Sequence, residues 1–121
     1  MLNTFGCSTV ETSAAALAVE AGIDGERLIT RPLGRQFRSR LELLLRQDRQ
    51  AIVVMSFAGV DMMDASFADE AFAALAASRG HAGTAFGCLV LHDLGDTSFD
   101  NFELAVLSRP TREPGLRNCT I

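Results

Sequence analysis

Polar side chains that could take part in chemistry follow two apolar runs of the chain, residues 51–60 and 85–91. They are carboxylates, one hydroxyl and one imidazole: Asp61, Asp64, Ser66, His92, Asp93 and Asp96. If the two runs are neighbouring parallel strands, their C-terminal ends share one edge of a sheet, so we expect these side chains to lie close together. Such a group could bind a metal ion, exchange protons or, at the serine, accept a phosphate.

The sequence contains no specific catalytic or metal-binding motif. The spacings of the acidic residues match no known ligand pattern, and acidic residues before a helix are usually caps, so we expect no metal ion. There is no P-loop, dinucleotide-binding fingerprint or nucleophile elbow, so we expect no enzyme and no cofactor. The enzymatic alternative would use His92 with Asp93 or Asp96 as acid and base.

Ser66 allows two interpretations with different consequences. As a helix cap, its hydroxyl would accept a backbone amide hydrogen bond and add about 1 kcal/mol to stability relative to alanine. As a phosphoacceptor, it would stand where free amides and the helix dipole favour an anion, although Asp64, Asp69 and Glu70 would repel the new charge. Asp69 and Glu70 are adjacent in a first turn and should point in different directions, which favours compensation of the helix dipole over an acid/base pair.

The composition is that of one ordered domain. The chain has 121 residues, of which 48% are hydrophobic and 21% charged. A net charge of −4 disfavours nucleic acid as a partner. The run at residues 51–60 is too short to cross a bilayer and residues 1–10 lack a secretory pattern, so we expect a cytoplasmic protein without membrane contact. Cys7, Cys88 and Cys119 have no paired spacing, which argues against a disulfide framework.

Hydrophobic periodicity predicts alternating helices and strands. The predicted helices cover residues 8–22, 31–47, 66–80 and 96–109, and the predicted strands cover residues 26–30, 51–57 and 85–91. The run at residues 51–57 has no polar alternation, which predicts a central strand buried on both faces. A strand, helix, strand order of this length predicts a right-handed parallel crossover and an α/β fold. We expect a mainly parallel or mixed sheet of about four strands flanked by helices.

Local signals suggest how the helices begin and how their charges pair. Residues 8–11, Ser-Thr-Val-Glu, match the capping-box pattern, so we expect them to begin the first helix. Glu42 lies four residues from both Arg38 and Arg46, so the charges of the arginine-rich helix should pair along its own surface. This pattern favours a solvated face over a nucleic-acid stripe.

Two stretches of the sequence resemble a known family. The run AIVVMSFAGVDMMDASFADEAFAAL at residues 51–75 resembles STAS-like domains, which are related to anti-sigma factor antagonists. The run LITRPLGRQFRSRLELLL at residues 28–45 resembles the threonine-arginine segment that leads into the first helix of that group. The resemblance covers residues 28–75. With the helix and strand pattern, we expect a helical N-terminal segment at residues 1–26, a STAS-like core at residues 27–109 and an irregular tail at residues 110–121.

The resemblance implies a protein without enzymatic activity that binds a protein partner and is often switched by serine phosphorylation. In anti-sigma factor antagonists the partner is an anti-sigma factor, a kinase of the histidine-kinase-like ATPase type. The acceptor serine there follows an aspartate that matches Asp64. Here Ala65 occupies that acceptor position, Ser66 matches a second serine of the motif, and Phe67 replaces a glycine.

The predicted partner-binding surface combines these positions with their neighbours. Its residues are Asp61, Met62, Asp64, Ser66, Asp69 and Glu70, with His92, Asp93 and Asp96 as a second loop. The alternative is a small-molecule or nucleotide site in a concave pocket between the same strand-end loops. A homodimer is compatible with a domain of this size, but no sequence feature specifies it.

Overall fold

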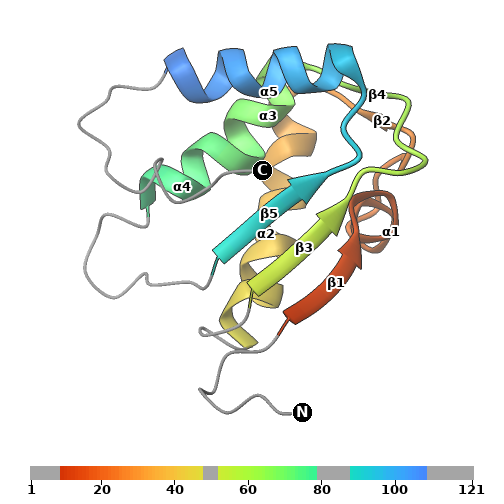
Figure 1. Cartoon of the computed structure of the whole chain (residues 1–121), viewed down its shortest axis with the longest axis vertical. Helices are drawn as coiled ribbons and strands as arrows, with labels where there is room; N and C mark the ends of the chain where they lie inside the picture. The colour runs from red at the N-terminus through yellow and green to blue at the C-terminus, as the bar shows by residue number, and fades with distance from the viewer. Residues whose placement is uncertain (1–8, 48–51, 79–87, 109–121) are drawn as a thin grey trace.

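The computed structural model describes residues 9–47, 52–78 and 88–108 (Figure 1). Its elements are, in order, β1 (Thr9–Ser13), α1 (Ala14–Glu20), β2 (Arg27–Leu28), α2 (Arg31–Gln47), β3 (Ile52–Ser56), β4 (Met62–Met63), α3 (Ala65–Ala68), η1 (Asp69–Ala73), α4 (Ala74–Ser78), β5 (Cys88–His92) and α5 (Asp96–Ser108). Because α3, the π-helical η1 and α4 follow one another without a break, we call them together the 65–78 helix.

The main sheet has three parallel strands in the order β1-β3-β5, and β2 pairs with β4, also in parallel, as a separate two-stranded sheet. The predicted α/β class and the parallel arrangement of the strands at 51–57 and 85–91 are therefore confirmed, with three and two strands in place of one sheet of about four. Figure 1 shows α2 passing behind the main sheet, with α5 and the 65–78 helix beyond its β5 edge.

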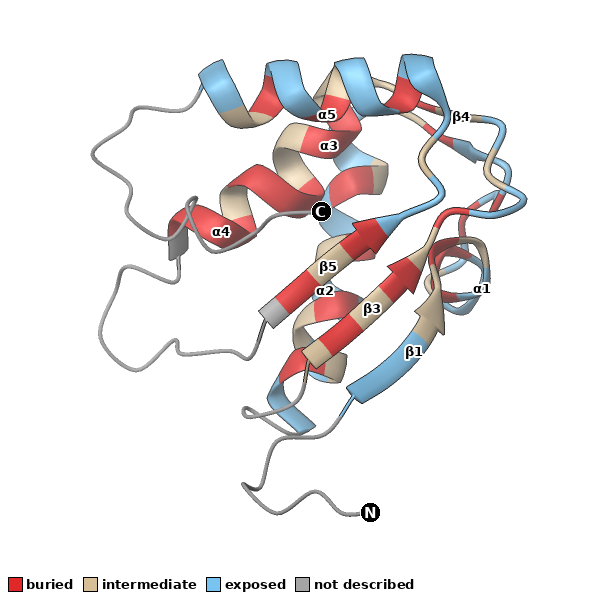
Figure 2. Ribbon diagram, in the orientation of Figure 1, coloured by how far each residue is buried: buried red, intermediate tan, exposed pale blue. Residues whose placement is uncertain are grey.

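Burial alternates along the central strand β3. Val53 and Met55 are buried, whereas Ile52, Val54 and Ser56 are half-buried (Figure 2). The prediction of burial on both faces is wrong for the described residues, because successive side chains of a strand point to opposite faces and only one of these faces is fully covered. The continuous apolar run therefore belongs to a sheet with one packed face.

The first described element is a strand where the sequence predicted a helix. Residues Thr9–Ser13 form β1 and pair along their whole length with β3. The helix starts only at Ala14, and Ser13 caps it by accepting a hydrogen bond at Oγ from the amide of Ala16, 3.2 Å away. The β-branched residues Thr9, Val10 and Thr12 favour a strand once a central strand is available for pairing, and this pairing outweighs the local capping pattern.

The other predicted elements within the described ranges agree with the structure in type. The strands β2, β3 and β5 lie at the predicted positions, and α2 begins at the predicted residue. Asp96, which the sequence suggested as a cap of the last helix, is instead the first residue of α5. The expected cap at Ser8, the expected helix end at Gly80 and the predicted tail at residues 110–121 lie outside the described residues. None of the helices in the described ranges has both the length and the apolar character that crossing a bilayer requires.

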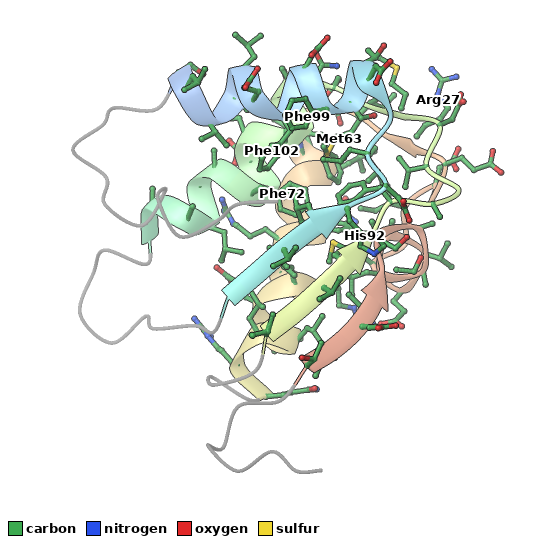
Figure 3. All side chains as sticks on the ribbon, in the orientation of Figure 1. Arg27, Met63, Phe72, His92, Phe99 and Phe102 are labelled. Atoms are coloured by element: carbon green, nitrogen blue, oxygen red, sulfur yellow. The ribbon has the colours of Figure 1, made fainter. Side chains whose placement is uncertain are left out.

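Five phenylalanines join the helices and the sheet into one core. The ring of Phe37 on α2 packs edge-on against Phe67 at 5.3 Å and against Phe72 at 5.6 Å between ring centres. Phe72 also contacts Phe57 after β3 and Phe102 on α5, both at 6.0 Å (Figure 3). Such pairs contribute about 0.5 to 1.5 kcal/mol each beyond the area that they bury.

Gly34 allows α2 and the 65–78 helix to approach closely. A Cβ atom at this position would stand 2.9 Å from the carbonyl oxygen of Phe67 and 2.9 Å from Cβ of Glu70. Neither the Phe67 backbone nor the Cβ atom of Glu70 can move aside without a cost in free energy. The glycine therefore sets the separation of the two helices that carry the candidate site.

We expect Gly34→Ala to destabilise the protein, although alanine is the better helix former by about 1 kcal/mol. The added methyl group must push the two helices apart, at a cost of about 1 to 3 kcal/mol. Urea unfolding would measure the difference. Ser39→Ala, at an exposed position of the same helix, is the control and should leave the free energy of unfolding nearly unchanged. A Gly34→Ala protein as stable as the wild type would contradict the close approach.

Candidate functional site

Asp64 connects the starts of two helices. As the N-cap of the 65–78 helix, its Oδ1 accepts a hydrogen bond from the amide of Phe67 at 2.7 Å. The amide of Thr30, directly before α2, donates to the same carboxylate at 3.3 Å from Oδ1 and 3.1 Å from Oδ2. The backbone of Asp64 is also held, because its amide donates to the carbonyl of Leu28 at 3.0 Å.

Of the two interpretations of Ser66, the helix cap is therefore wrong. Asp64 directly precedes the first helical residue and has extended backbone angles, the conformation that an N-cap requires. Ser66 is the second helical residue, so its side chain projects from the first turn. Asp64 and Ser66 are both good capping residues two positions apart, and only the helix start decides between them.

Thr30 has an unusual backbone conformation at the same junction. Its φ of 74° lies in the left-handed region, which a β-branched residue seldom adopts and which costs about 1 to 3 kcal/mol. The carbonyl of Thr30 accepts a hydrogen bond from the amide of Gly34 at 3.1 Å, and the amide of Thr30 donates to the carboxylate of Asp64. This conformation starts α2 so that Arg31, its first residue, faces the 65–78 helix.

Arginines of α2 bind the acidic pair on the 65–78 helix. Arg31 Nη1 lies 2.7 Å from Asp69 Oδ2 and 3.5 Å from Glu70 Oε2, and the hydrogen bond to Asp69 is the largest cause of the raised pKa of Arg31. Glu70 is also 3.6 Å from Arg35 and 3.7 Å from Arg38. The prediction that Asp69 and Glu70 point in different directions is wrong, since both contact one guanidinium group.

Arg38 has a partner on another helix that the charge spacing of α2 did not predict. The sequence spacing suggested that Glu42 would serve Arg38 and Arg46 along α2. In the structure, Arg38 reaches Glu70 on the neighbouring helix, where Nη1 also donates to the Glu70 carbonyl at 2.8 Å. Asp69 and Glu70 open the π-helical segment η1, a rare conformation that is frequent at functional sites.

Ser66 lies in the wall of a surface hollow of about 400 Å³. The hollow separates the start of the 65–78 helix from the second half of α5. It is lined by Arg31, Ala65, Ser66, Asp69, Leu104, Ala105 and Ser108. None of these residues belongs to the loop at residues 92–96, so this hollow is not the concave pocket expected between the two strand-end loops.

The C-terminal ends of β3 and β5 meet at one edge of the sheet, where Ser56 and Phe57 contact His92 and Asp93. Ser56 Oγ donates to Asp93 Oδ2 at 3.2 Å, and His92 Nδ1 lies 3.2 Å from the same oxygen. The amide of Phe57 donates to the carbonyl of His92 at 2.9 Å. Asp93 has a φ of 62°, and its side chain is 57% exposed, against 46% for His92. Figure 3 shows His92 at the end of β5, beside the end of β3.

The start of α5 fixes the β4 loop through two residues that the sequence analysis did not single out. The amide of Met63 donates to Oγ of the buried Ser98 at 3.1 Å, and Asn101 Nδ2 donates to the carbonyl of Met63 at 2.9 Å. Ser98 and Asn101 are three residues apart and so lie on one face of the helix, which is the sequence signal that could have identified them as a pair. These bonds place β4, and hence Asp64, next to α5.

The predicted site residues thus fall into separate groups. Asp64 is engaged in the helix junction, Asp69 and Glu70 bind arginines, and His92 with Asp93 forms a surface pair. Asp61 and Asp96 are exposed, and Met62 is half-buried. Within residues 9–47, 52–78 and 88–108, no group of three or more histidine, cysteine, aspartate and glutamate side chains could hold a metal ion.

We expect Asp64→Ala to lower the free energy of unfolding by about 2 kcal/mol, the upper end of the range for loss of an N-cap, because the amide of Thr30 loses its acceptor as well. Chemical denaturation followed by circular dichroism would measure the loss. Asp61→Ala, an exposed change in the same loop, is the matched control. Equal losses for both variants would contradict the role of Asp64 as the shared acceptor.

Glu70→Gln should destabilise the protein more than Glu42→Gln, by about 1 kcal/mol at low salt, because Glu70 is the carboxylate that contacts three arginines. Salt screens partly exposed charges, so the difference should shrink as the salt concentration rises. Unfolding curves of both variants at two ionic strengths provide the measurement. A larger effect at Glu42 would favour pairing along α2 instead.

A family model described as a STAS-like domain of unknown function (DUF4325) matches residues 34–97. The match includes most of α2, the strands β3, β4 and β5, and the 65–78 helix with Asp64 and Ser66. Neither a search of curated proteins nor a search of solved structures found a match. The matched stretch is more than half of the chain, and the α/β arrangement of parallel strands is consistent with a STAS-like fold. The chain therefore belongs to this family of STAS-like domains.

Proposed function

We propose that this STAS-like domain is a regulatory module without enzymatic activity, and that it binds a protein partner through the surface around Ser66. The surface comprises the loop from Asp61 to Asp64 and the start of the 65–78 helix. Phosphorylation of Ser66 regulates the binding. The partner is of the anti-sigma factor class, a kinase of the histidine-kinase-like ATPase type, as the resemblance of residues 51–75 implies.

The position of Ser66 is the observation that carries this proposal. Asp64 caps the helix, so the hydroxyl of Ser66 is not needed for that purpose. Ser66 is half-buried and lines the hollow beside α5. A phosphate added there would change the shape and the charge of a concave surface while the helix start kept its cap.

The charges of the hollow support a switch at this position. A phosphoserine carries a charge of about −1.5 to −2 and accepts strong hydrogen bonds, particularly from arginine. Arg31 and Asp69 line the same hollow and bind each other at 2.7 Å. The phosphate would repel Asp69 and compete with it for Arg31, which is half exposed. Modification of Ser66 would therefore rearrange the charges that a partner meets.

The geometry of the histidine supports a non-enzymatic role. Asp93 already accepts a hydrogen bond from Ser56, and both members of the His92–Asp93 pair are exposed to solvent. Acid/base catalysts usually lie in clefts that hold the substrate. This pair lies outside the residues that line the hollow.

A small anionic molecule is the second candidate ligand. The volume of the hollow, about 400 Å³, is within the usual range of about 300 to 1,000 Å³ for ligand sites, and Arg31 offers an exposed guanidinium group. A nucleotide or another phosphate compound that raises the melting temperature of the wild type, but not of Arg31→Ala, would favour this alternative.

We expect Ser66→Asp to lose the partner that the wild type captures, because a negative charge enters the binding surface. The measurement is a pull-down with wild-type, Ser66→Ala and Ser66→Asp baits from extracts of the cells that produce the protein. Mass spectrometry of the recovered wild-type bait should find phosphate on Ser66. Circular dichroism of each bait checks that the fold is retained.

Ser39→Asp is the matched control, since Ser39 is exposed on α2 and lies outside the hollow. This bait should retain the partner. Identical partners for wild type and Ser66→Asp, together with an unphosphorylated Ser66, would contradict the proposed switch.

A further inference from the structure

The outward face of α5 is both apolar and acidic. Of the six exposed large hydrophobic residues in the described ranges, three lie on this helix: Phe99 at 38%, Leu104 at 59% and Leu107 at 74% exposure. The opposite face buries Ser98, Phe102 and Ala105 against the core. Residues 96–108 include Asp96, Asp100 and Glu103, all exposed, and no basic residue.

Helical geometry places the acidic and apolar side chains together. Residues three or four apart lie side by side on a helix, which groups Asp100 with Leu104, Glu103 with Leu107, and Leu104 with Leu107. Apolar side chains flanked by carboxylates cannot gain from burial against an acidic or neutral polar surface. Their natural complement is a segment with an apolar stripe bordered by arginine or lysine.

This face continues into the hollow beside Ser66. Leu104, Ala105 and Ser108 of α5 form one wall of the hollow, and Ser66 and Arg31 belong to the opposite wall. A segment lying along α5 could therefore place one apolar side chain at the mouth of the hollow while its basic residues met Asp100 and Glu103. The surface of the proposed function and the exposed face of α5 form one continuous area.

We propose that the outward face of α5, comprising Asp100, Glu103, Leu104 and Leu107, is the docking surface for a basic amphipathic helix of the protein partner. The inference rests on the proposed function, since it names the chemistry of the partner at the same end of the molecule. Apolar contacts with Leu104 and Leu107 supply most of the affinity, and the carboxylates select the charge and the orientation of the helix.

The test uses a synthetic helical peptide of about four turns with a leucine stripe bordered by arginines. Isothermal titration with the full chain should show binding that weakens as salt is added. A peptide with glutamate in place of every arginine should not bind. Amide shifts in NMR spectra of the labelled full chain should change along residues 99–108.

Substitutions on α5 then distinguish the two contributions. Leu104→Ser should weaken binding by about tenfold or more, whereas Leu43→Ser on α2 should have no effect. The two leucines are a matched pair, with exposures of 59% and 57%. Asp100→Asn combined with Glu103→Gln should weaken binding and remove most of its salt dependence. Glu11→Gln combined with Glu20→Gln removes the same charge from β1 and α1 and should change neither property.

The inference would be overturned by a lack of binding of the basic peptide, by equal effects of Leu104→Ser and Leu43→Ser, or by NMR shift changes away from α5. Sedimentation that shows a wild-type dimer abolished by Leu104→Ser would also overturn it, because a second copy would then occupy the face. Failure here remains distinguishable from failure of the proposed function. The peptide titration needs no modification at Ser66, and the Ser66→Asp pull-down does not depend on the chemistry of α5.

Discussion

The carboxylate of Asp64 is the interaction on which the candidate site depends. It accepts hydrogen bonds from backbone amides at the starts of two helices, from Phe67 on the 65–78 helix and from Thr30 before α2. This shared acceptor helps to hold Thr30 in a left-handed conformation and orients Arg31 toward Asp69. The same two helices also pack closely at Gly34, and in the core the ring of Phe37 on α2 packs edge-on against Phe67 and Phe72. One side chain thus connects backbone geometry, helix packing and the charge pairs of the surface.

In the same arrangement, the residues that hold the helices lie within a few positions of the serine at which we propose regulation. Asp64 and Gly34 maintain the helix starts and their separation, whereas Ser66 lines the hollow and belongs to the turn that Asp64 caps. A modification at Ser66 can therefore alter the surface without removing the cap. The π-helical turn at Asp69 supports this division, because it carries the two carboxylates that α2 holds in place. On the other side of the hollow, α5 exposes apolar and acidic side chains and no basic ones.

The elements that could be predicted from the sequence are those with strong local patterns. The stripe of α2 and the apolar runs of β3 and β5 are visible in sequence because burial selects residue types at regular spacing. The strand β1 was not predictable in this way, since it forms by pairing with β3 about 43 residues away in the chain. For the same reason Arg38 could not be assigned to Glu70, which lies 32 residues away. At the site, the meeting of the ends of β3 and β5 followed from parallel topology. The bond between Asp64 and Thr30 and the anchors at Ser98 and Asn101 depend on residues that are distant in the sequence.

The most direct test of this account is the free energy of unfolding of Ser66→Ala. If Asp64 alone caps the helix and Ser66 is available for a partner, the substitution should change stability by no more than about 0.5 kcal/mol, as expected for a position without a structural role. A loss of about 1 kcal/mol or more, the usual cost of removing an N-cap, would contradict the account. In that case Ser66 would be part of the helix start, and a modification there would disturb the fold that the proposed switch requires to stay intact.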